Sequence, residues 1–283
     1  MHKNILIPTD YSRNAFNAIV YAFELFKNID CTFYIFHSYY LQHSARGNFL
    51  FPEPEPSEYD AAARHSAEKM IFLKNKVNLL ADNPRHTIYY DHKFGSFIDL
   101  IEEQVKINDI DLIVMGTRGV TNDGEVAYGR NSVNIMENIR DCAVLAIPSN
   151  ISYRDINEIV FPTNFKNLYI ESEMKTFVKI AKQGKSPIRI LHIGKEANLT
   201  ERQKNNRTQL ESHFKDLEFT YHWLDRVGIK EGLLSFVDER KSGMIAFVNR
   251  KHWFFGSAFT NPLVKSLGVH SKVPILALHD SRT

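Results

Sequence analysis

The residues best suited to chemistry follow a short apolar run near the middle of the chain. In order, they are Gly116, Arg118, Gly119, Gly129, Arg130, Asn131 and Ser132, with two residues between the first two glycines and nine between the second and third. Glycines let the backbone approach an anion closely, and successive backbone N–H groups form an anion-binding nest. A helix beginning near Ser132 adds unpaired N–H donors and the positive end of its dipole. The pattern indicates a site for a polyphosphate.

Alternating strands and helices position these groups. Residues 112–115 are apolar without alternation, as expected of a strand covered on both faces, and they lead into the glycine loop. A similar run near the N-terminus ends in Pro8, Thr9 and Asp10, and apolar residues then recur at helical spacing from 15 to 26, with Ser12 as the expected N-cap. Further helices are predicted over 61–80, with Met70, Ile71 and Leu73 on its apolar side, near 97–105 and near 133–139. The alternation predicts a doubly wound parallel sheet.

The whole pattern occurs twice. NILIPTDYS at 4–12 corresponds to NEIVFPTNF at 157–165, and TFYIFHSY at 32–39 to PIRILHIG at 187–194, with His37 opposite His192. Three further pairs follow in the same order: 87–103 with 220–236, 111–119 with 244–252, and 142–148 with 272–278. Five matching blocks predict two tandem domains, at 1–150 and 151–283.

One segment has no counterpart in the second half. Residues 41–60 contain Pro52, Pro54 and Pro56, which argue against regular structure, and three glutamates that keep the segment solvated. The segment follows the carboxyl end of the second strand, the edge where open α/β sheets bind ligands. It is therefore either a lid over a site or a surface loop.

Together, Pro8-Thr9-Asp10, the Gly-x2-Gly-x9-Gly spacing and the final strand 142–148 resemble the ATP-binding subgroup of the universal stress protein family. Chain length and repetition resemble its tandem two-domain members, and the resemblance covers essentially the whole chain. It implies two five-stranded α/β domains with strand order 3-2-1-4-5, the adenine nucleotide alpha hydrolase-like fold. The first and fourth strands are then neighbours, so Asp10 and Met115 meet where the winding direction reverses.

The resemblance also implies roles for the site residues. Asp10, after Pro8 and Thr9, would face the ribose and adenine, and the backbone near Ser38 would contact the adenine edge. Met115 and Gly116 would line the sugar. The phosphates would be held by Gly119, Gly129, Arg130, Asn131 and Ser132, with Arg118 adding charge. The implied cofactor is ATP, with ADP, AMP and accompanying Mg²⁺ left open.

Arg130 departs from the family pattern, in which Ser or Thr follows the third glycine. The position loses a hydroxyl donor and keeps its backbone N–H. The guanidinium either pairs with phosphate oxygens or points outward and leaves a weaker site. If no phosphate binds, the glycine loop is only a turn between a strand and a helix.

The second copy lacks the features of the phosphate site. Asn164 replaces Asp10, and Asn249 and His252 stand where Gly116 and Gly119 stand in the first copy. Aromatic residues follow at 253–255 and 259, where a phosphate would need close approach to the backbone. This copy is predicted to be structural or an interaction module, with the aromatic residues forming either core or a partner surface.

Composition limits the class of partner. A net charge of +2 argues against nucleic-acid binding. The charge is −5 over 1–150 and +7 over 151–283, so the halves are suited to dock on each other or to bind an acidic partner. No apolar run is long enough for a membrane span, and the N-terminus does not resemble a signal peptide. Two cysteines without metal or redox spacing favour the cytoplasm.

We therefore expect a cytoplasmic stress-response protein that binds ATP in its first copy and acts as a nucleotide-dependent regulator or sensor. The alternative is a scaffold that works without nucleotide. No catalytic residue and no metal site are predicted, because Asp10 is expected at the sugar and no His/Cys cluster has zinc spacing. Any ATP hydrolysis would be slow. By the resemblance the two domains pair through their last strands, and a homodimer is left open.

Overall fold

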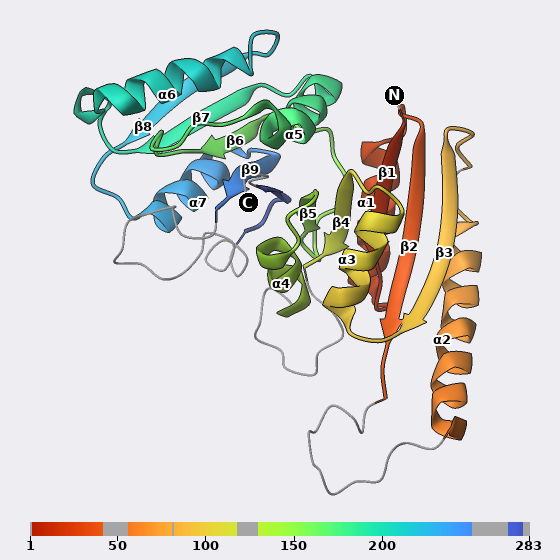
Figure 1. The fold of residues 1–283 in the computed structure, drawn as a ribbon. Coiled ribbons are helices and arrows are strands. Elements are labelled where there is room, and N and C mark those ends of the chain that lie inside the picture. The colour runs from red at the N-terminus through yellow and green to blue at the C-terminus, as the bar shows by residue number, and fades with distance from the viewer. Residues whose placement is uncertain (1, 42–55, 81, 118–129, 251–270, 280–283) are drawn as a thin grey trace, which may run out of the picture. The chain divides into compact units, whose positions relative to one another are not determined.

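The structure is a computed structural model that describes residues 2–41, 56–80, 82–117, 130–250 and 271–279 (Figure 1). Contacts divide the chain into two compact units, residues 1–115 and residues 116–283. Each unit is built from strands joined by helices.

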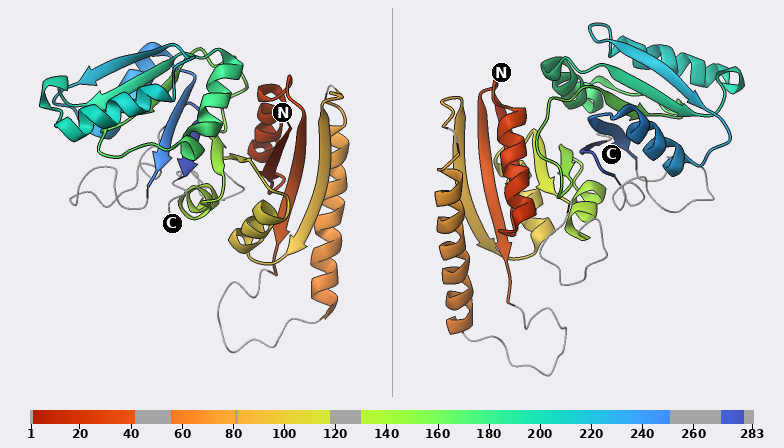
Figure 2. Two further views of the ribbon diagram at one scale, coloured as in Figure 1. Left: turned by 45° about the horizontal axis from the view of Figure 1, so that its top comes forward. Right: turned by 180° about the vertical axis from the view of Figure 1, so that it is seen from behind.

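The described residues of the first unit form four parallel strands. Along the chain the elements are β1 (Lys3–Pro8), α1 (Arg13–Leu25), β2 (Cys31–Tyr39), α2 (Pro56–Val77), β3 (His86–Phe94), α3 (Phe97–Ile107) and β4 (Leu112–Gly116). The strands lie in the order β3-β2-β1-β4 and pair in parallel. The helices α1 and α3 cover opposite faces of this sheet (Figures 1 and 2). The central strand β1 is therefore covered on both sides, and Ile5, Leu6 and Ile7 are fully buried.

In the second unit, the part of the chain that the structure describes forms six strands. Its elements are α4 (Arg130–Asn138), β5 (Ala143–Ile147), β6 (Ile159–Pro162), α5 (Glu171–Gly184), β7 (Ile188–Ile193), a 3₁₀ turn (Glu196–Asn198), α6 (Glu201–Ser212), β8 (Phe219–Leu224), α7 (Ile229–Arg240), β9 (Met244–Asn249) and β10 (Ile275–His279). The strand order is β5-β10-β9-β6-β7-β8. Helices α5 and α6 cover one face of this sheet and α7 covers the other (Figures 1 and 2).

This strand order confirms the predicted fold class. Strands β6 to β10 form a five-stranded parallel sheet that runs 3-2-1-4-5 when numbered within the second copy. The first four strands of the first copy follow the same order. In each copy the first and fourth strands are neighbours, since β1 pairs with β4 and β6 pairs with β9.

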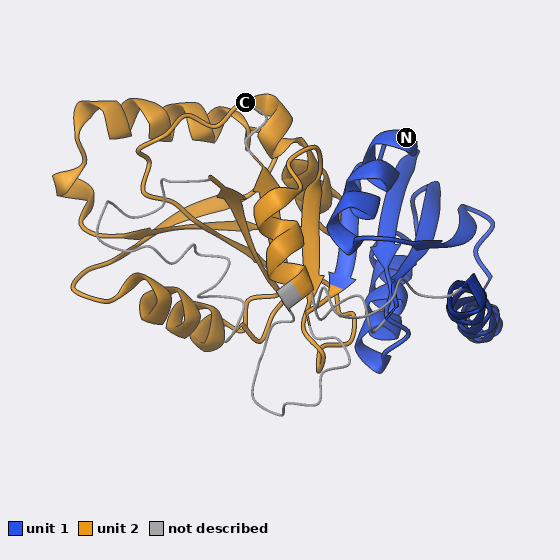
Figure 3. Ribbon diagram, turned by 60° about the horizontal axis from the view of Figure 1, so that its bottom comes forward, with its two compact units in different colours: residues 1–115 blue, residues 116–283 orange. Residues whose placement is uncertain are grey.

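The fifth strand of the first copy, β5, belongs to the second compact unit (Figure 3). It pairs antiparallel with β10, with Leu145 opposite Leu276. Contacts thus divide the chain after residue 115, whereas the sequence repeat divides it after residue 150. The first division reflects contacts in space and the second reflects sequence similarity, so the domain boundaries 1–150 and 151–283 stay a prediction.

Helix α2 differs from its prediction in two respects. It begins at Pro56 instead of near residue 61, so part of the segment expected to lack regular structure is helical. Proline suits the first turn of a helix, because the N–H that it lacks has no intrahelical acceptor there. Ile71 was expected on the inner face with Met70 and Leu73, yet it is 60% exposed and those two are buried. The expected lid or surface loop at 42–55 lies outside the described residues.

Candidate functional site

The turn after β1 is built by two side chains that accept backbone N–H groups. The buried Thr9 accepts the N–H of Tyr11 on its Oγ1 at 3.0 Å, and Oδ1 of Asp10 accepts the N–H of Ser12 at 3.0 Å. Tyr11 has a φ of 64°, in the left-handed region that non-glycine residues rarely adopt. These bonds stabilise the turn and leave Asp10 exposed at the carboxyl end of β1.

The end of β2 fixes the same turn. The N–H of Thr9 donates to the carbonyl of Phe36 at 2.8 Å. Nδ1 of His37 lies 2.6 Å from the carbonyl oxygen of Thr9 and donates to it, because a carbonyl only accepts. Burial lowers the pKa of His37, so the ring is neutral at pH 7 with its proton on Nδ1. Ser38 follows directly and is half-buried. The structure thus brings the turn and the end of β2 together.

Tyr11 links the turn to α2, a contact that sequence reasoning missed. Its ring centroid lies 4.3 Å from that of His37, and its hydroxyl donates to the carbonyl of Ser66 at 3.1 Å. Burial raises the pKa of Tyr11, so the phenol stays protonated and remains a donor. The available signal was an aromatic residue directly after Pro-Thr-Asp or Pro-Thr-Asn in both copies, Tyr11 and Phe165.

The second unit carries the start of the glycine loop and the helix that follows it. The N–H of Thr117 donates to the carbonyl of Ile147 at 3.0 Å, and Oγ of Ser132 donates to the carbonyl of Thr117 at 3.1 Å. Thr117 and Ser132 are buried, while Asn131 is exposed. The Ser132 hydroxyl therefore holds the first turn of α4 against the residue that follows β4.

The predicted site residues are distributed over both compact units. The first unit contains Pro8, Thr9, Asp10, Ser38 and Met115, and the second contains Gly116, Arg130, Asn131 and Ser132. Met115 is buried in β4, which pairs with β1, so Met115 and Asp10 lie at the same sheet edge. Arg118, Gly119 and Gly129 lie outside the described residues, and only the helical backbone of Arg130 is described. The role of each residue toward a ligand stays a prediction.

Comparison with protein families agrees with this arrangement of turn and sheet. The model of the universal stress protein family matches residues 1–148, more than half of the chain. The chain belongs to the universal stress protein family. The match includes the turn after β1, the glycine loop and β5, and it ends before the second copy begins. No relative matches among curated proteins.

Solved structures resemble this universal stress protein over its full length. A universal stress protein from Archaeoglobus fulgidus DSM 4304 is 13% identical, with 98% of each chain covered and a TM-score of 0.70. A functionally unknown protein from Pseudomonas aeruginosa PAO1 is 10% identical over 98% of this chain and 92% of that chain, with a TM-score of 0.57. A universal stress protein from Archaeoglobus fulgidus in complex with dAMP is 16% identical over 44% of this chain and 99% of that chain, with a TM-score of 0.32. The two full-length likenesses show the fold over both copies.

The second copy of this universal stress protein repeats the turn after its own first strand, β6. Oγ1 of Thr163 accepts the N–H of Phe165 at 3.0 Å, and Oδ1 of Asn164 accepts the N–H two residues further on at 3.0 Å. Phe165 has a φ of 55°, and Nδ1 of His192 donates to the carbonyl of Thr163 at 2.9 Å. Both copies therefore share the turn, and they differ in whether it carries Asp10 or Asn164.

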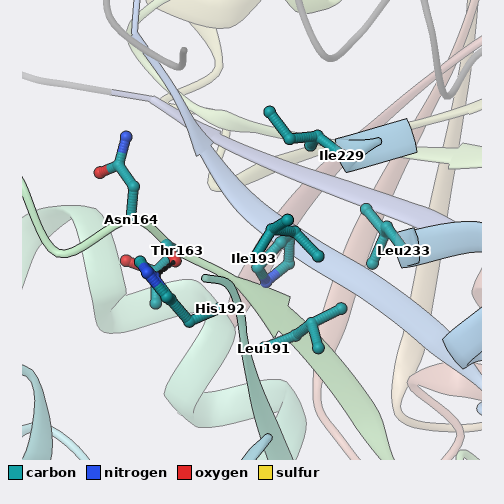
Figure 4. Close-up of a pocket in the computed structure, with 8 residues that line it drawn as sticks. Thr163, Asn164, Leu191, His192, Ile193, Ile229 and Leu233 are labelled. Carbon is teal, nitrogen blue, oxygen red and sulfur yellow. Dashed lines mark hydrogen bonds between the residues drawn. The ribbon is translucent and has the colours of Figure 1, made fainter. Parts of the chain in front are cut away.

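A small pocket lies beside this second turn (Figure 4). Its lining combines the turn, the end of β7 and apolar side chains of α7: Pro162, Thr163, Asn164, Leu191, His192, Ile193, Ile229 and Leu233. Its volume of about 20 Å³ has room for about one water molecule.

The position of Gly116 is filled by a side chain in the second copy. Asn249 is buried, and its Nδ2 donates to the carbonyl of Met136 at 2.5 Å. The next residue, Arg250, donates to Oε2 of Glu173 at 2.9 Å and to a backbone carbonyl of the 163–170 segment, that of Leu168, at 2.8 Å. Both side chains are engaged by protein groups at the edge where a phosphate would bind. His252 and the aromatic residues after it lie outside the described residues.

The described residues contain neither a metal-binding cluster nor a membrane-spanning helix. Within the described ranges, no three His, Cys, Asp or Glu side chains form a group able to hold a metal ion. No helix described by the structure combines the length and the apolar character needed to cross a membrane. Both cysteines are buried free thiols.

Proposed function

We propose that this universal stress protein binds an adenine nucleotide, with ATP as the ligand, in its first copy. The observation that carries the proposal is the turn after β1, which presents Asp10 beside the ends of β2 and β4. The strand order reverses at this point, which is where open α/β sheets bind ligands. The Gly-x2-Gly-x9-Gly loop after β4 adds backbone suited to a polyphosphate.

The nucleoside would occupy the edge formed by β1, β2 and β4. Asp10 would accept hydrogen bonds from ribose hydroxyls, with Pro8 and Thr9 shaping the turn beneath it. The backbone at Ser38 would contact the adenine edge, and Met115 and Gly116 would line the sugar. The fixed hydrogen bonds around Thr9 support this assignment, because a rigid turn loses little conformational entropy on binding.

The phosphates would lie at the first turn of α4. The first four N–H groups of a helix have no intrahelical acceptor, so they can donate to an anion. The remaining contacts are assigned to Arg118, Gly119, Gly129, Arg130 and Asn131. Because the Ser132 hydroxyl donates to the carbonyl of Thr117, we assign its backbone N–H to the phosphate and its side chain to holding the helix. Mg²⁺ would enter bound to the phosphates of ATP.

The proposed role is regulation by occupancy, in a cytoplasmic response to stress. A bound nucleotide stabilises the folded state by mass action and can order the loops that contact it. Asp10 is assigned to the sugar and not to the γ-phosphate, so hydrolysis would be slow for want of a base at the attacking water.

We also propose that the two copies, residues 1–150 and 151–283, pair with each other. The antiparallel register of β5 and β10 supports this pairing, as do the opposite net charges of the two halves. The pairing covers strand edges that would otherwise be open to another chain. A homodimer of this protein would then use a different surface.

Isothermal titration calorimetry with ATP tests the site. Wild type should bind, and Gly119→Trp should abolish binding by filling the loop. Asp10→Ala should weaken binding about 10- to 100-fold, since it removes hydrogen bonds to a charged group. The matched control is Asn164→Ala, which alters the equivalent turn of the second copy and should bind ATP as wild type does. Absence of binding by wild type, or equal weakening by both alanine variants, would refute the assignment.

The second candidate function is a scaffold that works without nucleotide. In the second copy, the side chains of Asn249 and Arg250 already form hydrogen bonds within the protein at the sheet edge where a ligand would bind. This observation favours a scaffold. Mass spectrometry of small molecules that co-purify with the protein separates the two functions. A nucleotide-free protein whose melting temperature is unchanged by millimolar ATP would favour the scaffold.

A further inference from the structure

The carboxyl-terminal end of α4 is held by side chains of the second copy. The carbonyl of Met136, in the last turn of α4, accepts Nδ2 of Asn249 at 2.5 Å, and Nε2 of His279 lies 2.9 Å from the same oxygen. Asn249 is the last residue of β9, and His279 is the last residue of β10. Because the last four carbonyls of a helix have no intrahelical donor, the ends of β9 and β10 act as an external cap for α4.

Arg140 ties the chain after α4 to the same strand ends. Its Nη1 donates to the carbonyl of Asn249 at 2.6 Å, and its Nη2 donates to the carbonyl of Glu137 at 2.8 Å. Nδ1 of His279 lies 2.7 Å from the carbonyl oxygen of Cys142, directly before β5. Asn249 and His279 are only 7% and 6% exposed, so loss of one partner would leave a desolvated polar group. We call Arg140, Asn249 and His279 the α4 brace.

Asn249 has a second significance within the repeat. It stands where the first copy has Gly116, the first glycine of the phosphate loop. A glycine there would have no side-chain amide to donate to the carbonyl of Met136. The residue that stands in place of the first glycine therefore supplies one member of the α4 brace.

The amino-terminal end of α4 is the proposed phosphate site. Ser132 fastens that end to Thr117 at 3.1 Å. The helix has nine residues and is about 13 Å long, so it is short enough to move as one body. A displacement at Met136 is then passed on to the N–H groups near Asn131.

We propose that Asn249 and His279 are positioning residues for the nucleotide site of the first copy, and that the second copy sets the affinity of this site through α4. The inference rests on the proposed binding of nucleotide in the first copy. By linkage, the nucleotide strengthens the brace by the same factor by which the brace strengthens nucleotide binding. The second copy then acts as a regulatory domain for the nucleotide site of the first copy.

Calorimetry with ATP on Asn249→Ala tests the proposal. The matched control is Ser242→Ala, at a residue that lies before the first residue of β9. This change also removes one buried hydrogen bond, in which Oγ of Ser242 donates to Oε1 of Glu158 at 2.6 Å. We expect Asn249→Ala to weaken ATP binding about five- to tenfold and Ser242→Ala to leave it within about twofold. Equal affinities for both folded variants would overturn the inference. A wild type that does not bind ATP would instead overturn the proposed function.

Hydrogen exchange on wild type supplies a readout that needs no variant. Saturating ATP should slow backbone N–H exchange in β10 and at the end of α4 more than in β8, which lies at the far edge of the second sheet. A purely structural brace predicts no such dependence on ATP. Equal protection of β10 and β8 under conditions where calorimetry shows ATP bound would overturn the inference.

Discussion

His279 should make the stability of this protein depend on pH in a defined window. The side chain is 6% exposed, and its ring nitrogens face the carbonyl oxygens of Met136 and Cys142. Burial lowers the pKa of His279 to about 4; the two carbonyls and Asp141 oppose this shift, and the charge of Arg140 adds to it. Burial therefore favours the neutral ring in the folded protein, in which only one of the two ring nitrogens carries a proton and donates to its carbonyl.

The direction of the effect follows from the two protonation states. In the unfolded chain His279 has its ordinary pKa of 6.5, so the unfolded state takes up a proton first as the pH falls. The stabilising contribution is fully present above pH 6.5 and is lost as the pH falls from 6.5 through 4. A shift of this size corresponds to about 3 kcal/mol of unfolding free energy, at about 1.4 kcal/mol per pH unit.

Urea denaturation between pH 7.5 and 4.5, on wild type and His279→Gln, measures this contribution. Glutamine can donate to one of the two carbonyls and does not titrate, so the difference in unfolding free energy between the two proteins should shrink as the pH falls. Burial also lowers the pKa values of His37, His192 and His222, but these residues are present in both proteins and their contributions cancel. A difference that is the same at both ends of the pH range would refute the reasoning.

Four further variants test the hydrogen bonds of Glu158, the packing and the turn. Burial alone would raise the pKa of Glu158, but hydrogen bonds from Arg240 and Arg189 lower it to about 2. Glu158→Gln should therefore lower the free energy of unfolding by about 3 kcal/mol in urea denaturation at pH 7. This difference from wild type should shrink below pH 4, where the carboxylate of the wild type begins to take up a proton. Phe177→Ala, at a fully buried site, should cost about 3–5 kcal/mol in the same assay, whereas a near-zero cost would contradict the assigned core. Thr9→Val and Thr163→Val remove equivalent turn acceptors and should each cost about 1 kcal/mol, but calorimetry should show weaker ATP binding only for Thr9→Val.

The order of the strands could be predicted because the chain repeats itself. Pro8-Thr9 and Pro162-Thr163 mark the ends of two equivalent first strands, and the family resemblance then supplies the strand order. The same local signals predicted that Asp10 follows the first strand and that Ser12 caps the next helix. These signals depend on residues close together in the sequence, so they can be recognised without knowledge of distant contacts.

Contacts between distant residues carried no such signal. Asn249 and Met136 are 113 positions apart, and His279 and Met136 are 143 positions apart, so no local pattern announces the α4 brace. Helix α6 carries little sequence signal for another reason: among its residues only Asn206 and Leu210 are buried, which leaves no apolar stripe. Its start is marked instead by a capping box between Thr200 and Gln203, a signal that the sequence does contain.

The shared turn limits which residues can account for a difference between the two copies. Tyr11 and Phe165 both adopt positive φ, at a cost of about 1 kcal/mol each, although only the first copy has a glycine loop. The turn therefore serves the fold, by joining the first strand to the histidine at the end of the second, and a ligand is not needed to explain it. The functional difference must lie in positions that changed, among them Asp10 against Asn164 and Gly116 against Asn249. A carboxylate restored at 164 would still face an edge filled by Asn249, whose amide is committed to α4, so the two changes are not independent.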